Sequence, residues 1–339
     1  MSGVQQITVA PEEADQRLDR WFRRRFPQVT QGLIERMLRR GEIRVDGARA
    51  RASLRLAAGQ TVRVPPLPEA APPPPAPRIG EADARMIRAA VIFRDDDLIV
   101  LNKPPGLAVQ GGSGTTRHVD ALAQALVEAG PPPRLVHRLD RDTSGVLLLA
   151  RSPRAAAALA RAFHARETRK VYWALVAGCP APRAGTIRFG LVKARGEAER
   201  MVCIHPDAVA DTPGARHAVT DYVVIEAVGR RAAWVALSPV TGRTHQLRAH
   251  MAELGNPVIG DGKYGGRSQV NDGSGWGAHL GGEVSRKLHL HARSLTIDHP
   301  RTGRRITFTA PLPAHMARSW ALFGWNEGDA PPDPFAGRP

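Results

Sequence analysis

The chain has 339 residues, 42% of them hydrophobic, and its 48 Lys and Arg against 32 Asp and Glu give a formal net charge of +16 at pH 7. This length exceeds the ~100–200 residues usual for one domain, so we expect two domains, and the charge indicates a polyanionic partner. The only cysteines, Cys179 and Cys203, lack CxxC spacing, which excludes a disulfide scaffold and a zinc ribbon.

The partner that the charge indicates is either a nucleic acid or an anionic membrane. No apolar run approaches the ~20 residues of a membrane span. The N-terminal stretch MSGVQQITVAPEEADQ lacks the charged-then-apolar order of a secretory signal. We therefore expect a cytoplasmic protein that binds nucleic acid and no membrane, with a monomer as the default oligomeric state.

Residues 1–65 are expected to form a small basic module. Apolar residues recur at helical spacing from Leu18 to Phe26, and a second helix is expected from its N-cap at Thr30 to Arg40. The strand-and-turn pattern EIRVDG follows, and a last strand ends in VRVP. This order of elements predicts a small domain with two helices and a short sheet.

The module contains 13 arginines and 7 acidic residues. Six arginines fall on the two expected helices, away from the apolar stripe: Arg20, Arg23, Arg24, Arg36, Arg39 and Arg40. Composition alone leaves two interpretations open, a face that contacts RNA phosphates and a solvated arginine face. The stretch PPLPEAAPPPPAP then predicts an extended, proline-rich linker over residues 66–88.

Residues 89–325 are expected to form an α+β domain, followed by a C-terminal tail at 326–339. Strands are expected at 91–93, 98–101, 146–150 and 171–176, and helices at 119–129, 155–165 and 244–254. Because the strands follow one another without regular helical crossovers, we expect a mainly antiparallel mixed sheet with flanking helices. Residues 266–286, rich in Gly and polar side chains, are predicted to be a mobile surface insertion.

The stretch RLVHRLDRDTSGVLLLAR at residues 134–151 places charged side chains between two apolar strands. Charged residues are seldom placed there for packing, so this stretch is the first candidate for chemistry. Its spacing also allows a structural interpretation, in which Asp142 to Gly145 form a hydrogen-bonded turn and Asp140 makes an ordinary ion pair.

The part HRLDRDTSG, residues 137–145, resembles the HRLDxxTSG signature of the RluA-type pseudouridine synthases, in which the aspartate is catalytic. Other blocks resemble the family in the same order: NKPPG before the signature, then KVY, TGRTHQLR, GDGKYG, LHA and HP. The stretch AVQGGSG is most similar to the RluC branch, and the first 65 residues resemble an S4-type RNA-binding domain. The resemblance implies a pseudouridine synthase fold with a central catalytic cleft that converts specific uridines of large-subunit (23S) ribosomal RNA to pseudouridine.

The implied reaction accounts for a carboxylate in this place. It breaks the N1–C1′ bond of uridine, turns the base and joins C5 to C1′ without a change of redox state, so we expect no cofactor and no metal. A carboxylate could attack covalently or abstract a proton from the sugar, and both roles remain open for Asp140. The nucleotide must first be flipped out of stacked RNA, at a cost of roughly a few kcal/mol.

The resemblance also implies the residues around Asp140. Arg248 would be its cationic partner, pointing off the apolar stripe of its helix, and Tyr172 would lie against the target base. Three residues would bind the substrate: Arg138, which moves toward the RNA as the base leaves the stack, Leu290, an apolar wall, and Arg243, which contacts the RNA backbone.

Other classes of function remain to be tested. Histidines 245, 250, 289 and 291 lack an HExxH pattern, a cysteine pair or a carboxylate triad, so structural histidines are expected rather than a metal site. A non-catalytic RNA-binding or ribosome-assembly factor is the main alternative. A hydrolase that uses Asp140 and Asp142 is the other. Free uracil as the product would indicate hydrolysis, and pseudouridine would indicate isomerisation. If neither product formed, the protein would only bind RNA.

Overall fold

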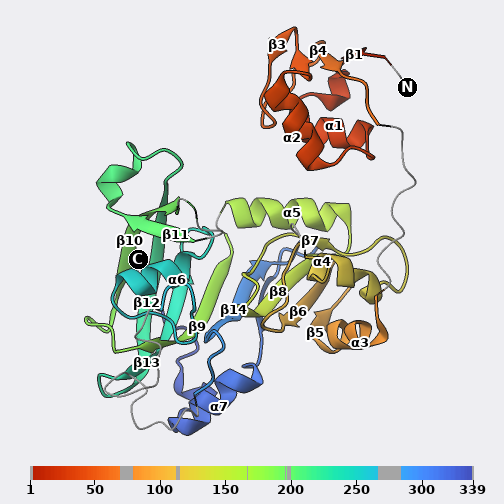
Figure 1. Ribbon diagram of the computed structural model, residues 1–339. Helices are drawn as coiled ribbons and strands as arrows, with labels where there is room; N and C mark the ends of the chain where they lie inside the picture. The colour runs from red at the N-terminus through yellow and green to blue at the C-terminus, as the bar shows by residue number, and fades with distance from the viewer. Residues whose placement is uncertain are drawn as a thin grey trace. The chain divides into compact units, whose positions relative to one another are not determined.

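The computed structural model describes residues 3–68, 79–111, 115–165, 167–194, 196, 200–265 and 284–337. It divides the chain into two units, Met1–Arg78 and Ile79–Pro339, which are described separately (Figure 1). Most of the expected insertion at 266–286, and residues 112–114 of the AVQGGSG stretch, lie outside the described residues. No helix within the described ranges is long and apolar enough to cross a membrane.

The N-terminal unit packs two helices on a small sheet. Its strands have the order β1-β4-β2-β3. The elements are β1 (Gln5–Thr8), α1 (Leu18–Arg25), α2 (Gln31–Arg40), β2 (Arg44–Val45), β3 (Ala48–Arg49) and β4 (Thr61–Val64). The hydroxyl of Thr30 accepts a hydrogen bond from the Leu33 amide, and Gly41 ends α2 in the left-handed conformation, so the predicted limits of this helix are confirmed.

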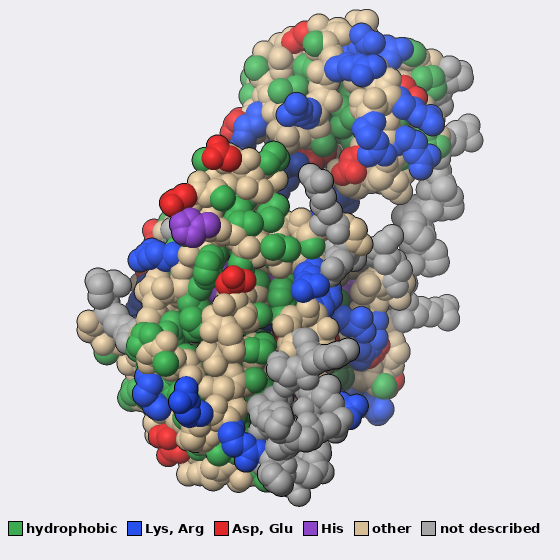
Figure 2. Space-filling model, turned by 60° about the vertical axis from the view of Figure 1, so that its left-hand side comes forward, with side chains coloured by type: hydrophobic (Ala, Val, Ile, Leu, Met, Phe, Trp, Pro, Cys, Tyr) green, Lys and Arg blue, Asp and Glu red, His purple; other side chains and the backbone are tan. Residues whose placement is uncertain are grey.

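The apolar stripe of these helices forms the core of the unit, where Leu18, Trp21, Phe22 and Ile34 are almost fully buried. The six arginines predicted to lie off this stripe are all exposed. Figure 2 shows basic side chains gathered on the visible face of this unit, at the top of the view. The helical periodicity therefore sorts the residues as expected, with a packed face and a cationic face.

The second unit begins inside the segment expected to be a linker. Residues 81–88 belong to helix α3 (Glu81–Ala89), whose Ala84 and Ile87 are buried in the core of the body. The proline-rich pattern stops at Pro77, and the EADARMIRA sequence that follows has both good helix formers and an apolar face. The expectation of a linker up to residue 88 is therefore wrong for its last part.

The body is built on an 11-stranded sheet with the order β11-β10-β12-β13-β9-β14-β8-β6-β5, and β15 and β7 pair with β14 and β8 (Figure 1). The strands are β5 (Val91–Arg94), β6 (Leu98–Lys103), β7 (Arg134–Leu135), β8 (Ser144–Ala150), β9 (Arg169–Ala177), β10 (Ala184–Lys193), β11 (Met201–Ile204), β12 (Arg216–Val228), β13 (Ala232–Pro239), β14 (Leu290–Asp298) and β15 (Arg305–Thr309). Every pair is antiparallel except β8 with β14, which confirms an α+β body with a mainly antiparallel mixed sheet.

Besides α3 and α7 (Ala314–Leu322), the described part of the body contains the helices α4 (Val119–Leu122), α5 (Pro153–His164) and α6 (Gln246–Glu253). The helix expected at 119–129 is shorter, because α4 gives way to a 3₁₀ turn at Ala123–Leu126. After Leu126 the chain becomes extended and enters Pro131 to Pro133, which cannot continue a helix.

The parallel contact between β8 and β14 joins the two halves of the sheet. It pairs His291 with Ser144 and Ala292 with Gly145. Gly145 has a φ of 109°, and a Cβ added there would lie 2.2 Å from the carbonyl oxygen of Ala292. Only glycine allows the strands to approach this closely. The glycine of the HRLDRDTSG signature thus places the signature loop at the middle of the sheet.

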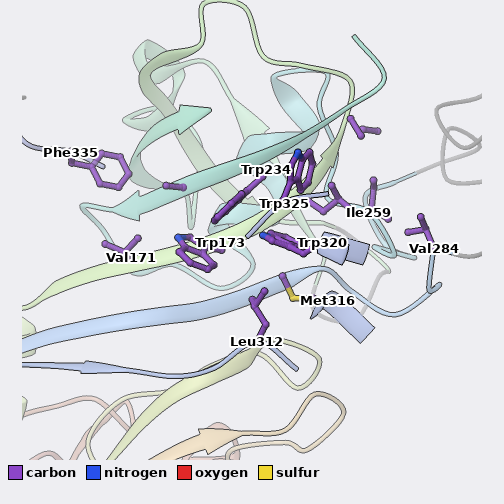
Figure 3. Close-up of a cluster of buried hydrophobic side chains, with 14 residues drawn as sticks. Val171, Trp173, Trp234, Ile259, Val284, Leu312, Met316, Trp320, Trp325 and Phe335 are labelled. Carbon is purple, nitrogen blue, oxygen red and sulfur yellow. The ribbon is translucent and has the colours of Figure 1, made fainter. Parts of the chain in front are cut away.

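A cluster of tryptophans fixes the C-terminal part of the body (Figure 3). Trp234 packs edge-on against Trp173 and Trp320, with ring centroids 4.7 and 5.4 Å apart. Phe335 is buried against the same cluster, and Asp333 makes an ion pair with Arg169. The segment from 326 to 337, expected only as a C-terminal tail, is therefore attached to the body.

Candidate active site

The loop that carries Asp140 connects β7 to β8. Leu139 is buried in the core, while the Asp140 side chain is 19% exposed. The Thr143 amide donates to the Asp140 carbonyl at 3.2 Å, which makes a turn of residues 140–143, whereas Ser144 and Gly145, expected in a turn that starts at Asp142, begin strand β8. The buried leucine and this turn hold the carboxylate at the edge of the core.

Lys103 anchors the same loop from beneath. Its ammonium is fully buried and donates to the carbonyl oxygens of Pro104, Leu107 and Arg141, each at 2.9 Å. Burial lowers the pKa of Lys103 to about 7, an effect that the carboxylates of Asp142 and Asp140 oppose. The NKPPG block thus fixes the backbone beside Asp140 through one side chain.

We expect Lys103→Met to destabilise the protein by about 3 kcal/mol, because each buried carbonyl left without a donor costs ~1–3 kcal/mol. Urea unfolding followed by the fluorescence of the tryptophan cluster measures this loss. Lys193→Met, at an exposed position of β10, serves as control and is expected to change stability by less than ~0.5 kcal/mol. Equal stabilities of the two variants would contradict the anchoring role of Lys103.

Arg248 lies on α6, only 6% exposed. Its Nε and Nη2 donate to Oδ2 and Oδ1 of Asp261 at 2.6 and 2.7 Å, and its Nη1 lies 3.8 Å from Oδ2 of Asp140. Helix α6 is buried on all sides from Gln246 to Met251, so a residue off the apolar stripe is still enclosed. The nearer partner of Arg248 is therefore Asp261, and Asp140 shares the remaining face of the guanidinium.

Tyr172 reaches the site from β9, where it pairs with Ala292 of β14 and Leu237 of β13. Burial raises the pKa of Tyr172, and the Asp140 carboxylate adds to this effect, so the phenol stays protonated.

A cavity of about 940 Å³ brings the expected residues together. Its lining includes all six side chains assigned to catalysis or substrate binding: Arg138, Asp140, Tyr172, Arg243, Arg248 and Leu290. Arg138 and Arg243 are exposed, whereas Leu290 is 2% exposed. This volume suits a nucleotide-sized ligand, and the lining combines buried apolar side chains such as Leu290, buried polar ones such as Arg248, and a cationic rim of exposed arginines.

Lys170, which the sequence analysis placed only within a motif, also lines the cavity. Its ammonium lies 4.9 Å from the centroid of the Phe163 ring, and burial lowers its pKa. The imidazole of His137 stacks on the same Phe163 ring, with ring centroids 4.7 Å apart. Within the described residues, no carboxylate forms an ion pair with Lys170.

His245 was expected to be structural but lies beside Asp140, with its Nε2 3.9 Å from Oδ2 of the carboxylate. It precedes α6 with a φ of 51°. Tyr264 lies next to it, with its hydroxyl 3.2 Å from Nδ1 of His245 and its ring 5.2 Å from the Arg248 guanidinium. The TGRTHQLR and GDGKYG blocks carry these residues, but spacing within a block does not tell which side chains meet.

The other histidines considered as metal ligands are engaged in hydrogen bonds. His250 bonds the hydroxyl of Thr220, and burial lowers its pKa to about 4. His289 makes hydrogen bonds with the hydroxyl of Ser319 and a backbone carbonyl. His291 makes hydrogen bonds with the hydroxyl of Ser144 and a second backbone carbonyl. These contacts favour structural roles.

One cluster within the described ranges has a spacing that a metal could use: Asp95, Asp97 and His299. Nδ1 of His299 accepts from the amides of Arg301 and Thr302, so its Nε2 carries the proton and donates to Asp95 at 2.9 Å. Asp97 pairs with Arg301 at 2.7 Å. The groups are therefore occupied by one another and by Arg301.

Comparisons with known proteins agree with this geometry. A family model described as RNA pseudouridylate synthase matches residues 97–253. "Ribosomal large subunit pseudouridine synthase C" of Vibrio cholerae is 34% identical over 93% of this chain and 96% of its own length. The Yersinia pestis protein of the same name is 36% identical over 91% and 92%. The solved structure of human RNA pseudouridylate synthase domain containing 4 has a TM-score of 0.58 and 29% identity, over 70% of this chain and 94% of that chain.

The sheet, the cavity and these matches define an RNA-modifying isomerase. The chain belongs to the RNA pseudouridylate synthase family. The resemblance found in the signature and its accompanying blocks is thereby confirmed over most of the chain.

Proposed function

We propose that this protein isomerises specific uridines of large-subunit (23S) ribosomal RNA to pseudouridine, with Asp140 as the catalytic residue. The observation that carries the proposal is the position of the Asp140 carboxylate. It lines a nucleotide-sized cavity, and its Oδ2 lies 3.8 Å from Nη1 of Arg248. The names of the relatives from Vibrio cholerae and Yersinia pestis support the choice of RNA. The proposal includes action as a monomer in the cytoplasm and requires no cofactor.

Asp140 supplies a negative charge next to the sugar of the flipped nucleotide. It either attacks the nucleoside, in a bond that breaks again before the product leaves, or removes a proton from the ribose and returns it as C5 adds. In each case the N1–C1′ bond breaks, C5 bonds to C1′ and the C5 hydrogen leaves as a proton. The Arg248 guanidinium places a positive charge 3.8 Å from Oδ2 of Asp140.

Tyr172 and Leu290 hold the base during this rearrangement. The phenol ring offers a flat surface for stacking, which repays part of the free energy of unstacking the nucleotide. Leu290 closes the cavity on its apolar side. The detached uracil is therefore kept near C1′ while it turns, and water does not trap the sugar.

The cationic rim of the cavity receives the RNA backbone. Arg138 lies two residues before Asp140 and is exposed, so its side chain is free to follow the strand as the base leaves the stack. Arg243 is exposed next to α6, and Lys170 adds an ammonium group to the lining of the cavity. Phosphates are the ligands that such cations prefer in RNA.

We propose that the N-terminal unit is an S4-like domain that adds affinity through phosphate contacts. Replacing Arg36 and Arg39 by glutamine should reduce the slope of log K against log salt by roughly 1–2, because each lost phosphate contact removes ~0.7–0.9 from that slope. Filter binding of ribosomal RNA at several salt concentrations measures it. The matched control is Arg230→Gln with Arg304→Gln, two exposed arginines of the body. Equal slopes for the two double variants would contradict the proposal.

The function is tested with 23S ribosomal RNA labelled with tritium at uridine C5. We expect release of tritium and the appearance of pseudouridine among the nucleosides after digestion, with no free uracil. Transfer RNA and 16S ribosomal RNA, labelled in the same way, serve as substrate controls and are expected to release far less. Binding of 23S RNA without tritium release would favour the RNA-binding factor, and free uracil would favour a hydrolase.

A further inference from the structure

Asp140 is approached by two donors at the same oxygen. The Nη1 of Arg248 lies 3.8 Å and the Nε2 of His245 lies 3.9 Å from Oδ2 of the carboxylate. Within the described part of the chain, no hydrogen bond reaches the other oxygen, Oδ1, and the residue lines the cavity. Both separations are longer than a hydrogen bond, so the two groups bring a positive charge and an N–H group to the Oδ2 side of the carboxylate without bonding it directly.

Both donors are held from one turn of the chain, at residues 260–265. Asp261 is 1% exposed, and its two oxygens accept from Nε and Nη2 of Arg248 at 2.6 and 2.7 Å. Oδ1 of Asp261 also accepts from the amides of Lys263 and Tyr264, so the carboxylate is fixed by its own turn. This bidentate contact occupies Nε and Nη2 and leaves Nη1 for Asp140.

Tyr264, in the same turn, has its hydroxyl within hydrogen-bond distance of Nδ1 of His245. Its hydroxyl oxygen accepts from the amide of Met201 at 2.8 Å, so its own hydrogen is available for Nδ1 of His245 at 3.2 Å. A neutral imidazole whose Nδ1 accepts must carry its proton on Nε2. That proton points to the side of the ring on which Asp140 lies.

The charge states of both groups agree with this reading. Burial lowers the pKa of His245, and the nearby Arg248 and Lys263 also lower it, while the carboxylates of Asp140 and Asp261 oppose them. Burial raises the pKa of Tyr264. His245 is thus a neutral donor, and Tyr264 keeps its hydroxyl hydrogen.

The backbone of His245 supports a role beyond packing. Its φ of 51° lies in the left-handed region, which is uncommon for residues other than glycine, although asparagine, aspartate and histidine adopt it more often than the rest. Such conformations are retained where the surrounding structure holds a side chain in a required place.

We propose that Asp261 and Tyr264 are positioning residues that act through Arg248 and His245 to hold Oδ2 of Asp140, so that Oδ1 faces the nucleoside. This inference rests on the proposed function, because it takes the carboxylate of Asp140 to be the reacting group. It assigns the GDGKYG block, which sequence analysis left without a role, to the alignment of the catalytic carboxylate.

The kinetic test is a double-mutant cycle between Tyr264→Phe and His245→Asn, where asparagine tolerates the left-handed backbone. We expect Tyr264→Phe to lower single-turnover rates on 23S RNA about tenfold and His245→Asn somewhat more, with KM within about twofold of the wild type. The double variant should be no slower than His245→Asn alone, because Tyr264 acts through that ring. Tyr222→Phe, which removes a buried hydroxyl bonded to Pro182 outside the cavity, is the matched control.

Two results would overturn the proposal: losses that multiply in the double variant, or a loss confined to KM. A second measurement does not depend on turnover. In ¹⁵N-resolved NMR at neutral pH, the ring resonances of His245 are identified as those that vanish in His245→Asn. In the wild type they should show the proton on Nε2, and in Tyr264→Phe the proton should no longer favour Nε2 over Nδ1. A proton on Nδ1 in the wild type would rule the proposal out, even if the protein proved inactive. A proton on Nε2 in an inactive protein would leave the positioning proposal intact and count against the proposed function alone.

Discussion

Asp140→Asn is expected to lower pseudouridine formation by at least about 10³-fold while leaving the fold intact. Asparagine has nearly the same shape as aspartate but carries no charge, so it neither attacks the nucleoside nor accepts a proton from the ribose. The side chain is 19% exposed and makes no hydrogen bond within the described residues, so its replacement leaves no buried donor unpaired. Tritium release from C5-labelled 23S RNA measures the loss.

Asp142→Asn is the matched control for this variant. Asp142 lies two residues further along the same loop and is exposed. It does not line the cavity. We expect its rate to stay within about threefold of the wild type, because a charge outside the cavity acts only through solvent-screened Coulomb forces. A comparable loss in both variants would revive the two-carboxylate hydrolase, and a nearly active Asp140→Asn would exclude Asp140 as the catalyst.

Local signals explain where the sequence predicted structure well. The helix from 31 to 40 was predicted within a residue because a capping hydroxyl at Thr30 and a glycine at 41 mark its ends. The antiparallel body followed from strands that succeed one another without helical crossovers. Helix α3 was missed because the proline-rich stretch before it suggested that the linker continued.

The site was only partly predictable for a different reason. The signature, KVY and TGRTHQLR blocks indicated Asp140, Tyr172 and Arg248, and the fold brings them into one cavity. The contacts of Arg248 with Asp261 and of His245 with Tyr264 join separate segments, and their geometry depends on how those segments pack. No periodicity within either segment encodes such a contact, so Asp261 and His245 became visible only in three dimensions.

Arg248→Met is expected to destabilise the protein by about 3–5 kcal/mol in addition to abolishing activity. The substitution leaves Asp261, which is 1% exposed, as a buried carboxylate without its cationic partner. Removing one member of a buried ion pair costs this much because the remaining charge has lost its compensation. Urea unfolding followed by tryptophan fluorescence reports the change.

The double variant Arg248→Met with Asp261→Asn separates stability from catalysis. The neutral amide still offers an oxygen to the backbone donors of Lys263 and Tyr264, so most of the lost stability should return. Activity should not return, because Asp140 still lacks the guanidinium. Arg243→Met, an exposed arginine of the same block, should change stability by less than ~0.5 kcal/mol. If the double variant is no more stable than Arg248→Met, then the buried charge of Asp261 is not the source of the loss, and the ion pair does not organise this side of the site.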